Sequence, residues 1–363
     1  MQQNKPKIAV VRLDRIGDTI LTLPAIKIIR DHYRDYQVVG IFNPHNSRLF
    51  VYDSKIIHPY FDSIQIIPVN LFYRNLKGHN FLNDVLNYLK ILFFRDSTGF
   101  EKVFVFSPTT VSYLLGSKLK ASKKYTYFYQ TRINRFFFSH NYTYYIDEVD
   151  KSQIDDLSKV RHEVFQNIEV VKLDLDISYQ NSALFKEDLE FLVQNFTGLT
   201  NLVVPNVSFE KYDVLIFDKE MFFYNEEGKV WLTRFVSYLI QKIQELSKKS
   251  YTSLKVAFIS PRKIHNAIHP EFMEMMNMIK DCRCLICFDS GIMHIASAFN
   301  VNLIAIFANR YFDFDVKRWK PLSKNVDIIK LDIFNELGMF EYQYTDPVEF
   351  ANYVFSHTEK YLK

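Results

Sequence analysis

The segment that most restricts the fold is residues 282–310, CRCLICFDSGIMHIASAFNVNLIAIFANR. An apolar run, Cys284 to Phe288, predicts a buried strand, and it ends at Asp-Ser-Gly (residues 289–291), residue types that commonly begin a helix. A second apolar run, Leu303 to Phe307, follows that helix. A strand, a short helix and a second strand in this order predict an α/β fold with a parallel sheet.

The start of that helix is a candidate phosphate site. Asp289 and Ser290 can cap the helix, and Gly291 lets another group approach the backbone closely. The exposed N–H groups and the positive end of the helix dipole favour an anion there. His294 lies one turn further and should point the same way. An ordinary capped helix that packs on a sheet explains these residues equally well, so this segment alone does not distinguish a phosphate site from a structural helix start.

Residues 7–30 have the pattern that begins a doubly wound domain. A strand, Ile8 to Leu13, runs into a turn that contains Arg15, Gly17 and Asp18, and an amphipathic helix follows. Such folds bind ligands at the carboxyl end of the first strand. Gly17-Asp18 is therefore either a plain turn and helix cap or a carboxylate held at a ligand site. The spacing is not the dinucleotide GxGxxG, which argues against a Rossmann dehydrogenase.

Taken together, the two segments resemble glycosyltransferase family 9, which includes the lipopolysaccharide heptosyltransferases. The run RLDRIGDTILTLPAIKIIR (residues 12–30) is similar to the family's R-x-x-x-x-G-D opening with its L-P-A. The run FDSGIMHIASAFNVNLIAIF (residues 288–307) is similar to its D-T-G-x-x-H donor signature. Three shorter similarities follow the expected order: Arg161-His162-Glu163 with Asn167, Lys229-Val230-Trp231 and Trp319-Lys320-Pro321.

The resemblance implies a GT-B fold, in which two Rossmann-like, doubly wound α/β domains face each other across a cleft. We expect an acceptor-binding domain over residues 1–195, a linker over 196–212 and a donor-binding domain over 213–345. Residues 346–363 are predicted to form a helix that packs back on the first domain.

The chemistry implied by the resemblance is inverting sugar transfer that uses no metal and no cofactor. Asp18 matches the G-D motif and is the predicted catalytic base. The predicted donor-binding residues lie near two helix starts: Lys229, Asp289, Ser290, Gly291 and His294. The predicted acceptor contacts are basic residues of the first domain: Arg12, Arg15, Lys120 and Lys123. A lone lysine at a position such as 229 usually faces solvent, so its role depends on the resemblance.

Basic and aromatic residues interleave in residues 118–138, KLKASKKYTYFYQTRINRFFF. Three interpretations remain open for this stretch. It can be a solvated strand and loop with aromatic core residues, or a patch for an anionic acceptor glycolipid or a membrane surface. Basic and aromatic alternation also suits single-stranded nucleic acid, but no RNP or OB pattern surrounds it, and we predict no nucleic-acid partner.

Composition narrows the class further. The net charge of +4 is too mild for a dedicated nucleic-acid binder. The three cysteines, Cys282, Cys284 and Cys287, lack the paired CxxC spacing of a metal site, so we predict buried reduced thiols and a cytoplasmic protein. No apolar run approaches the ~20 residues of a membrane span, so any contact with the inner membrane is predicted to be peripheral.

Departures from the family pattern affect the predicted identity of the donor more than the predicted fold. Ser290 replaces the usual threonine, and the turn Phe307 to Arg310 lacks the family's glycine. ADP-heptose is the leading donor and a lipopolysaccharide-core or other surface glycan the leading acceptor. The alternatives are another nucleotide sugar, a GT-B enzyme of different reaction, or a non-catalytic relative that binds a sugar nucleotide or glycolipid.

Overall fold

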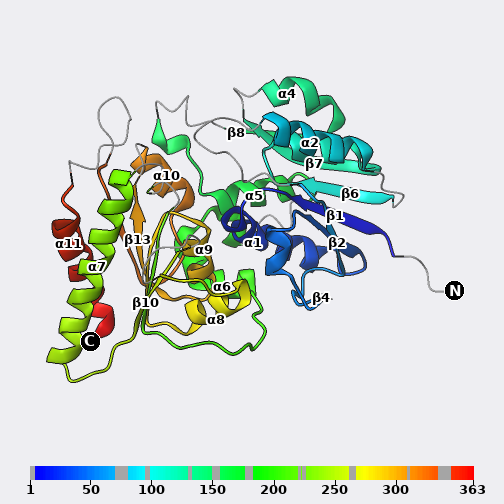
Figure 1. Ribbon diagram of the computed structural model, residues 1–363. Coiled ribbons are helices and arrows are strands. Elements are labelled where there is room, and N and C mark those ends of the chain that lie inside the picture. Colours follow the sequence, from blue (N-terminus) through cyan, green and yellow to red (C-terminus); the bar gives the residue numbers. More distant parts are fainter. Residues whose placement is uncertain are drawn as a thin grey trace. The chain divides into compact units, whose positions relative to one another are not determined.

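The computed structural model describes residues 5–69, 81–94, 99–129, 133–148, 156–175, 183–219, 222, 226–260, 267–308, 311–333 and 345–363. The chain divides into two compact units, Met1–Val203 and Val204–Lys363 (Figure 1). The last helix of the first unit, α6, ends at Thr200, where Asn201 takes a left-handed conformation. The first residues of the predicted linker are therefore helical.

The first unit contains a sheet of six parallel strands in the order β5-β2-β1-β6-β7-β8. The strands are β1 Lys7–Arg12, β2 Gln37–Phe42, β5 Ser63–Ile66, β6 Phe100–Val105, β7 Ala121–Tyr129 and β8 Tyr144–Glu148. A two-stranded hairpin, β3 (Val51–Tyr52) and β4 (Lys55–Ile56), lies outside this sheet. The order places the first strand in the middle, so the winding direction reverses between β1 and β6, as in dinucleotide-binding folds.

Helices cover both faces of this sheet (Figure 1). One face carries α1 Ile16–His32, α5 Glu163–Lys172 and α6 Leu189–Thr200, and the other carries α2 Phe81–Phe93, α3 Thr110–Lys118 and α4 Ile133–Phe138. Side chains alternate along β1, and Ala9, Val11 and Leu13 pack in the core under α2 and α3. Arg12 therefore points to the opposite face, towards α5.

The second unit repeats the same strand order, β11-β10-β9-β12-β13-β14, again all parallel. Its strands are β9 Val214–Phe217, β10 Val256–Ile259, β11 Ala267–Ile268, β12 Cys284–Phe288, β13 Asn302–Phe307 and β14 Val326–Lys330. Its helices are α7 Glu226–Lys249, α8 Phe272–Asp281, α9 Gly291–Ala298, α10 Phe312–Trp319 and α11 Pro347–Leu362. The winding direction here reverses between β9 and β12.

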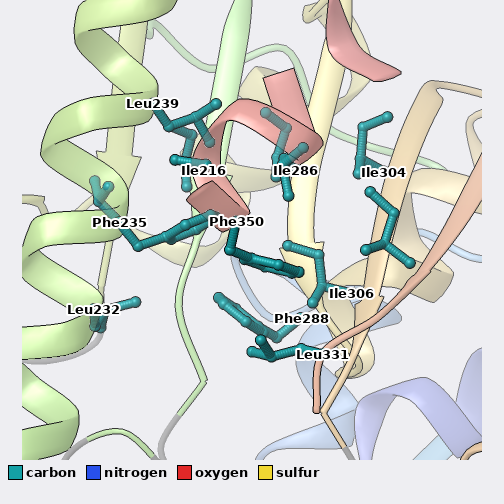
Figure 2. Close-up of a cluster of buried hydrophobic side chains, with 14 of the residues drawn as sticks. Ile216, Leu232, Phe235, Leu239, Ile286, Phe288, Ile304, Ile306, Leu331 and Phe350 are labelled. Carbon is teal, nitrogen blue, oxygen red and sulfur yellow. The ribbon is translucent and has the colours of Figure 1, made fainter. Parts of the chain in front are cut away.

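The core of the second unit lies between its sheet and the helices α7 and α11 (Figure 2). Central strands supply Ile216, Ile286, Phe288, Ile304 and Ile306, and α7 supplies Leu232, Phe235 and Leu239. Strands that are buried on both faces consist of continuous apolar runs, and these runs allowed the strands to be predicted from the sequence.

The C-terminal helix α11 belongs to this core. Phe350, Ala351 and Val354 are buried in it, and the rings of Phe350 and Phe235 lie 5.5 Å apart. The Trp231 indole N–H donates to the carbonyl of Thr345, 2.7 Å away, just before the helix begins. The apolar face of α11, in the segment predicted to pack back on the first domain, is therefore part of the core of the second unit.

The cysteines behave as predicted: Cys282, Cys284 and Cys287 are free and buried. Burial raises the pKa of Cys282 to about 12, so this thiol is unreactive. Within the described ranges, we found no helix with both the length and the apolar character to cross a membrane. In the turn that lacks the glycine, Ala308 follows Phe307 and is buried, while Asn309 and Arg310 lie outside the described residues.

Candidate functional site

Polar residues follow the two central strands of each sheet. In the first unit Arg12 ends β1 and Ser107 comes shortly after the end of β6. In the second unit Lys219 comes shortly after β9 and Asp289 directly follows β12. Both pairs of strands flank the point where the winding direction reverses, which is where open α/β sheets bind ligands. Each unit therefore has its candidate site at its own switch point.

Arg12 is the centre of the cluster in the first unit. Its side chain is 1% exposed, and its Nε lies 2.7 Å from an Asp14 carboxylate oxygen. Nη2 lies 3.4 Å from Glu163 and 3.7 Å from Asp18, and Nη1 donates to the carbonyl of Phe106 at 2.5 Å. One buried guanidinium is thus shared among three carboxylates.

Neighbouring side chains hold the backbone around Arg12 in place. The Ser107 hydroxyl accepts from the N–H of Leu13 at 2.7 Å, and the Asn43 amide donates to the Leu13 carbonyl at 2.6 Å. On the opposite side, the Asn167 amide donates to the carbonyl of Leu21 at 3.3 Å, while its oxygen faces Arg12 at 3.4 Å. The turn between β1 and α1 is therefore tied to β2, β6 and α5.

Asp18 is the member of this cluster that is open to solvent. It stands in the first turn of α1, and its side chain is 25% exposed, compared with 3% for Glu163. Arg12 lies behind it, and the carboxylate stands at the positive end of the α1 dipole. This is a partly desolvated carboxylate with one accessible side, which suits a general base.

Asp14 is a member that the sequence interpretation missed. Burial raises the pKa of its carboxyl group to about 7, Arg12 opposes this effect, and the carboxylates of Asp18 and Glu163 add to it. Its place two residues after Arg12, in the turn after a central strand, was a usable signal. Its burial was not visible in the sequence.

Asp14 should make stability depend on pH. Its native pKa lies above the ordinary value of 3.8, so the stability it contributes is fully present below that value and is lost as the pH rises through about 7. From about pH 5 to about pH 8, we expect the free energy of unfolding of the Asp14→Asn variant to rise by about 2 kcal/mol relative to that of the wild type. Urea denaturation at both pH values measures this, and an equal difference at both would contradict the assignment.

The predicted acceptor contacts do not form one group. Arg12 is buried and bonded within the protein, so the prediction that it contacts the acceptor is corrected. Arg15 is exposed at the N-cap of α1, beside the switch point. Lys120 and Lys123 are exposed around the start of β7, where Lys123 is level with Lys102 and Ile8, towards the amino ends of the strands. They lie at the opposite edge of the sheet from Asp18.

In the second unit the start of α9 has the features expected of an anion site. Ser290 is the N-cap of α9 and Gly291 its first helical residue. The Ser290 hydroxyl oxygen is buried and makes no hydrogen bond to any described residue. The N–H of Asp289 donates to the carbonyl of Ile306 at 2.8 Å, which holds this turn against β13, and His294 is 5% exposed on the same helix. A buried hydroxyl with no partner at a helix N-terminus is suited to donate to a bound anion.

Lys219, and not Lys229, is the lysine beside this group. Its Nζ lies 3.3 Å from an Asp289 carboxylate oxygen, and both side chains are about one-quarter exposed. Lys229 stands in the first turn of α7 and pairs on the surface with Glu226, at 2.5 Å. The sequence interpretation did not select Lys219, although it too follows a central strand.

Part of the second unit matches the model of a known protein family. Residues 269–347 match the model of the family described as glycosyltransferase family 9 (heptosyltransferase). This range includes Asp289, Ser290, Gly291 and His294 but neither Asp18 nor the lysines. No curated protein sequence matches the chain.

Solved structures match over the whole chain. Escherichia coli heptosyltransferase WaaC with ADP is 14% identical, with a TM-score of 0.59 over 98% of this chain and 99% of that one. A glycosyl transferase family 9 protein from Veillonella parvula is 16% identical, with a TM-score of 0.54 over 100% and 98% of the two chains. E. coli ADP-heptose lps heptosyltransferase II is 13% identical, with a TM-score of 0.52 over 97% and 99%. At these identities the likeness shows a shared fold, and the predicted GT-B class, with two Rossmann-like units, is confirmed.

Proposed function

We propose that the chain is a family 9 glycosyltransferase that transfers a sugar from a nucleotide sugar to a bacterial surface glycan with inversion at the anomeric carbon. The family match over residues 269–347 and the shared fold support this proposal. The observation that carries this proposal is the start of α9. There a buried Ser290 hydroxyl with no described partner meets the helix N-terminus, beside the Lys219–Asp289 pair. This combination suits the diphosphate of a nucleotide sugar.

The proposed reaction takes its base from the first unit and its leaving-group stabilisation from the second. Asp18 accepts the proton of the acceptor hydroxyl while that oxygen bonds to the anomeric carbon. The bond from that carbon to the diphosphate oxygen breaks, and the negative charge that develops there is stabilised by the N–H groups at the start of α9 and by the Lys219 ammonium. Asp289 and His294 orient the donor in this scheme, and Arg15 contacts an anionic group of the acceptor.

ADP-heptose is the proposed donor, and a lipopolysaccharide-core or similar glycan is the proposed acceptor. The support is that two of the matching structures are of WaaC, one with ADP and one with ADP-2-deoxy-2-fluoro heptose. Because such acceptors are lipid-anchored, we place the protein in the cytoplasm, in peripheral contact with the inner membrane.

Nucleotide binding tests the donor site. In a thermal-shift series with ADP, UDP, GDP and CMP, we expect ADP alone to stabilise the protein, by about 2.7 kcal/mol at a hundredfold excess over its dissociation constant. Lys219→Ala should remove most of this stabilisation, because it deletes the cation beside α9. Lys229→Ala is the matched control and should keep it.

Two results would change the proposal. If Lys229→Ala removes the ADP effect and Lys219→Ala does not, the diphosphate is held by the lysine predicted from the family motif. If no nucleotide stabilises the protein, the donor-site assignment is wrong and a non-catalytic relative becomes the better account.

A further inference from the structure

Two helices of the first unit have apolar residues on their outward faces. On α2, Leu86, Leu89 and Phe93 are 51%, 41% and 79% exposed, at positions i, i+3 and i+7 of one helical face. The opposite side of the same helix is buried through Asn87 and Ile91. A helix on the surface of a soluble protein normally has the reverse pattern, with polar residues outward.

The short helix α4 repeats this feature. Ile133, Phe136 and Phe137 are 70%, 81% and 54% exposed and stand at i, i+3 and i+4, again on one face. Among the residues that the structure describes, every exposed phenylalanine lies on α2 or α4. Isolated exposed apolar residues are common, but a concentration of this kind marks an interaction surface.

The two helices cover the same face of the sheet, on either side of α3 (Figure 1). The Thr110 hydroxyl at the start of α3 donates to Asn134 of α4 at 2.9 Å, and Lys118 at its end donates to the carbonyl of Ile91 of α2 at 3.0 Å. We call the outward residues of these helices the α2/α4 face: Leu86, Leu89, Leu92, Phe93, Ile133, Phe136 and Phe137.

Positive charge accompanies this face. Lys90 is exposed on α2 itself, and the exposed Lys120 follows Lys118, which contacts the end of α2. Residues 81–148 contain nine Lys and Arg and five Asp and Glu, an excess of four positive charges that equals the net charge of the whole chain. Lys102 does not belong to this face, because it is buried and pairs with Asp174 on the opposite side of the sheet at 2.7 Å, and Arg135 pairs with Asp147 at 2.7 Å.

We infer that the α2/α4 face is a docking surface for a lipid bilayer with anionic headgroups. Leucine and phenylalanine side chains enter the boundary between headgroups and acyl chains, and lysines at the edge of the face bind lipid phosphates. The positive excess favours this occupant over a second copy of the chain, which would bring like charges together. The inference also gives Lys120 a place, because it lies away from the Asp18 edge of the sheet. It does not depend on the proposed sugar transfer.

Vesicle binding by the full chain tests the inference. We expect the protein to co-sediment with vesicles of phosphatidylglycerol and phosphatidylethanolamine, and more weakly with phosphatidylcholine vesicles. The triple variant Phe93→Ser, Phe136→Ser, Phe137→Ser should bind about tenfold more weakly or worse to both, because the inserted apolar area is removed. Lys90→Glu with Lys120→Glu should weaken only the binding to phosphatidylglycerol vesicles, by several-fold.

A matched control removes three exposed apolar residues elsewhere: Leu157→Ser, Tyr251→Ser and Tyr353→Ser. It should bind vesicles like the wild type, and both triple variants should keep the wild-type melting temperature, since the changed side chains are exposed. Equal loss in both triple variants, or no vesicle binding by the wild type, would overturn the inference. So would a wild-type dimer, seen by light scattering, that the phenylalanine variant turns into a monomer, because the face would then bind a second copy.

Discussion

Replacing Asp18 by asparagine is expected to lower the rate of sugar transfer by about a thousandfold while nucleotide binding stays unchanged. Asparagine keeps the size of the side chain but cannot take a proton from the acceptor hydroxyl. The partly exposed Asp18 carboxylate is the member of the Arg12 cluster that a substrate can reach, so no other described residue of the cluster should replace it. Release of ADP from ADP-heptose in the presence of a lipopolysaccharide-core acceptor measures the rate.

Asp31→Asn is the matched control for this experiment. Asp31 lies on the same helix, α1, where it pairs with Lys27 on the surface at 2.5 Å. Its removal should leave the rate within twofold or so of the wild type, because surface substitutions of this kind have small effects. An Asp18→Asn enzyme that keeps a tenth or more of the wild-type rate would show that another group, with Asp14 the first candidate, is the base.

Replacing Arg12 by methionine is expected to destabilise the first unit by about 3–5 kcal/mol, because carboxylates are left without their buried cation. Asp14 and Glu163 are 14% and 3% exposed at the side chain, so water cannot replace the guanidinium. The substitution also removes the hydrogen bond to the Phe106 carbonyl, which links β1 to the end of β6. Urea denaturation at neutral pH, followed by circular dichroism, measures the change.

The same substitution at Arg15 provides the comparison. Arg15 is exposed at the start of α1, so Arg15→Met should cost under about 0.5 kcal/mol. If Arg12→Met costs no more than Arg15→Met, the cluster around Arg12 is not held together by charge. In a measurement of acceptor binding, Arg15→Met should have the larger effect, because the proposal gives only Arg15 a direct contact with the acceptor.

Local patterns in the sequence were enough to predict the doubly wound units. Strands such as Cys284–Phe288 are buried on both faces and therefore appear as unbroken apolar runs, and polar residues follow directly where the ligand edge begins. Asp18, Asp289 and Ser290 were selected in this way as candidate site residues. Glu163 and Asn167 were noted only through the family resemblance, and their contact with Arg12 was not predicted. They reach Arg12 from a helix about 150 residues away in the chain, and spacing along the sequence has no information on such contacts.

The sequence also did not show which way a helix face or a lysine side chain would point. The apolar spacing of α11 indicated a buried face but not which unit would cover it, and Phe350 proved to pack on Phe235 of the second unit. On α2 the same kind of spacing suggests a core face, yet Leu89 and Phe93 point outward. Similarly, Lys219 and Lys229 both lie between β9 and the body of α7, and only the folded chain shows which of them lies beside Asp289.

The central claim is that the start of α9 binds the diphosphate of the donor, and a crystal structure of the protein with ADP tests it most directly. The account predicts a phosphate oxygen within about 3 Å of both the Ser290 hydroxyl and the Gly291 N–H, with the Lys219 ammonium within hydrogen-bond distance of the diphosphate. ADP bound elsewhere, with the Ser290 hydroxyl still without a partner, would contradict it.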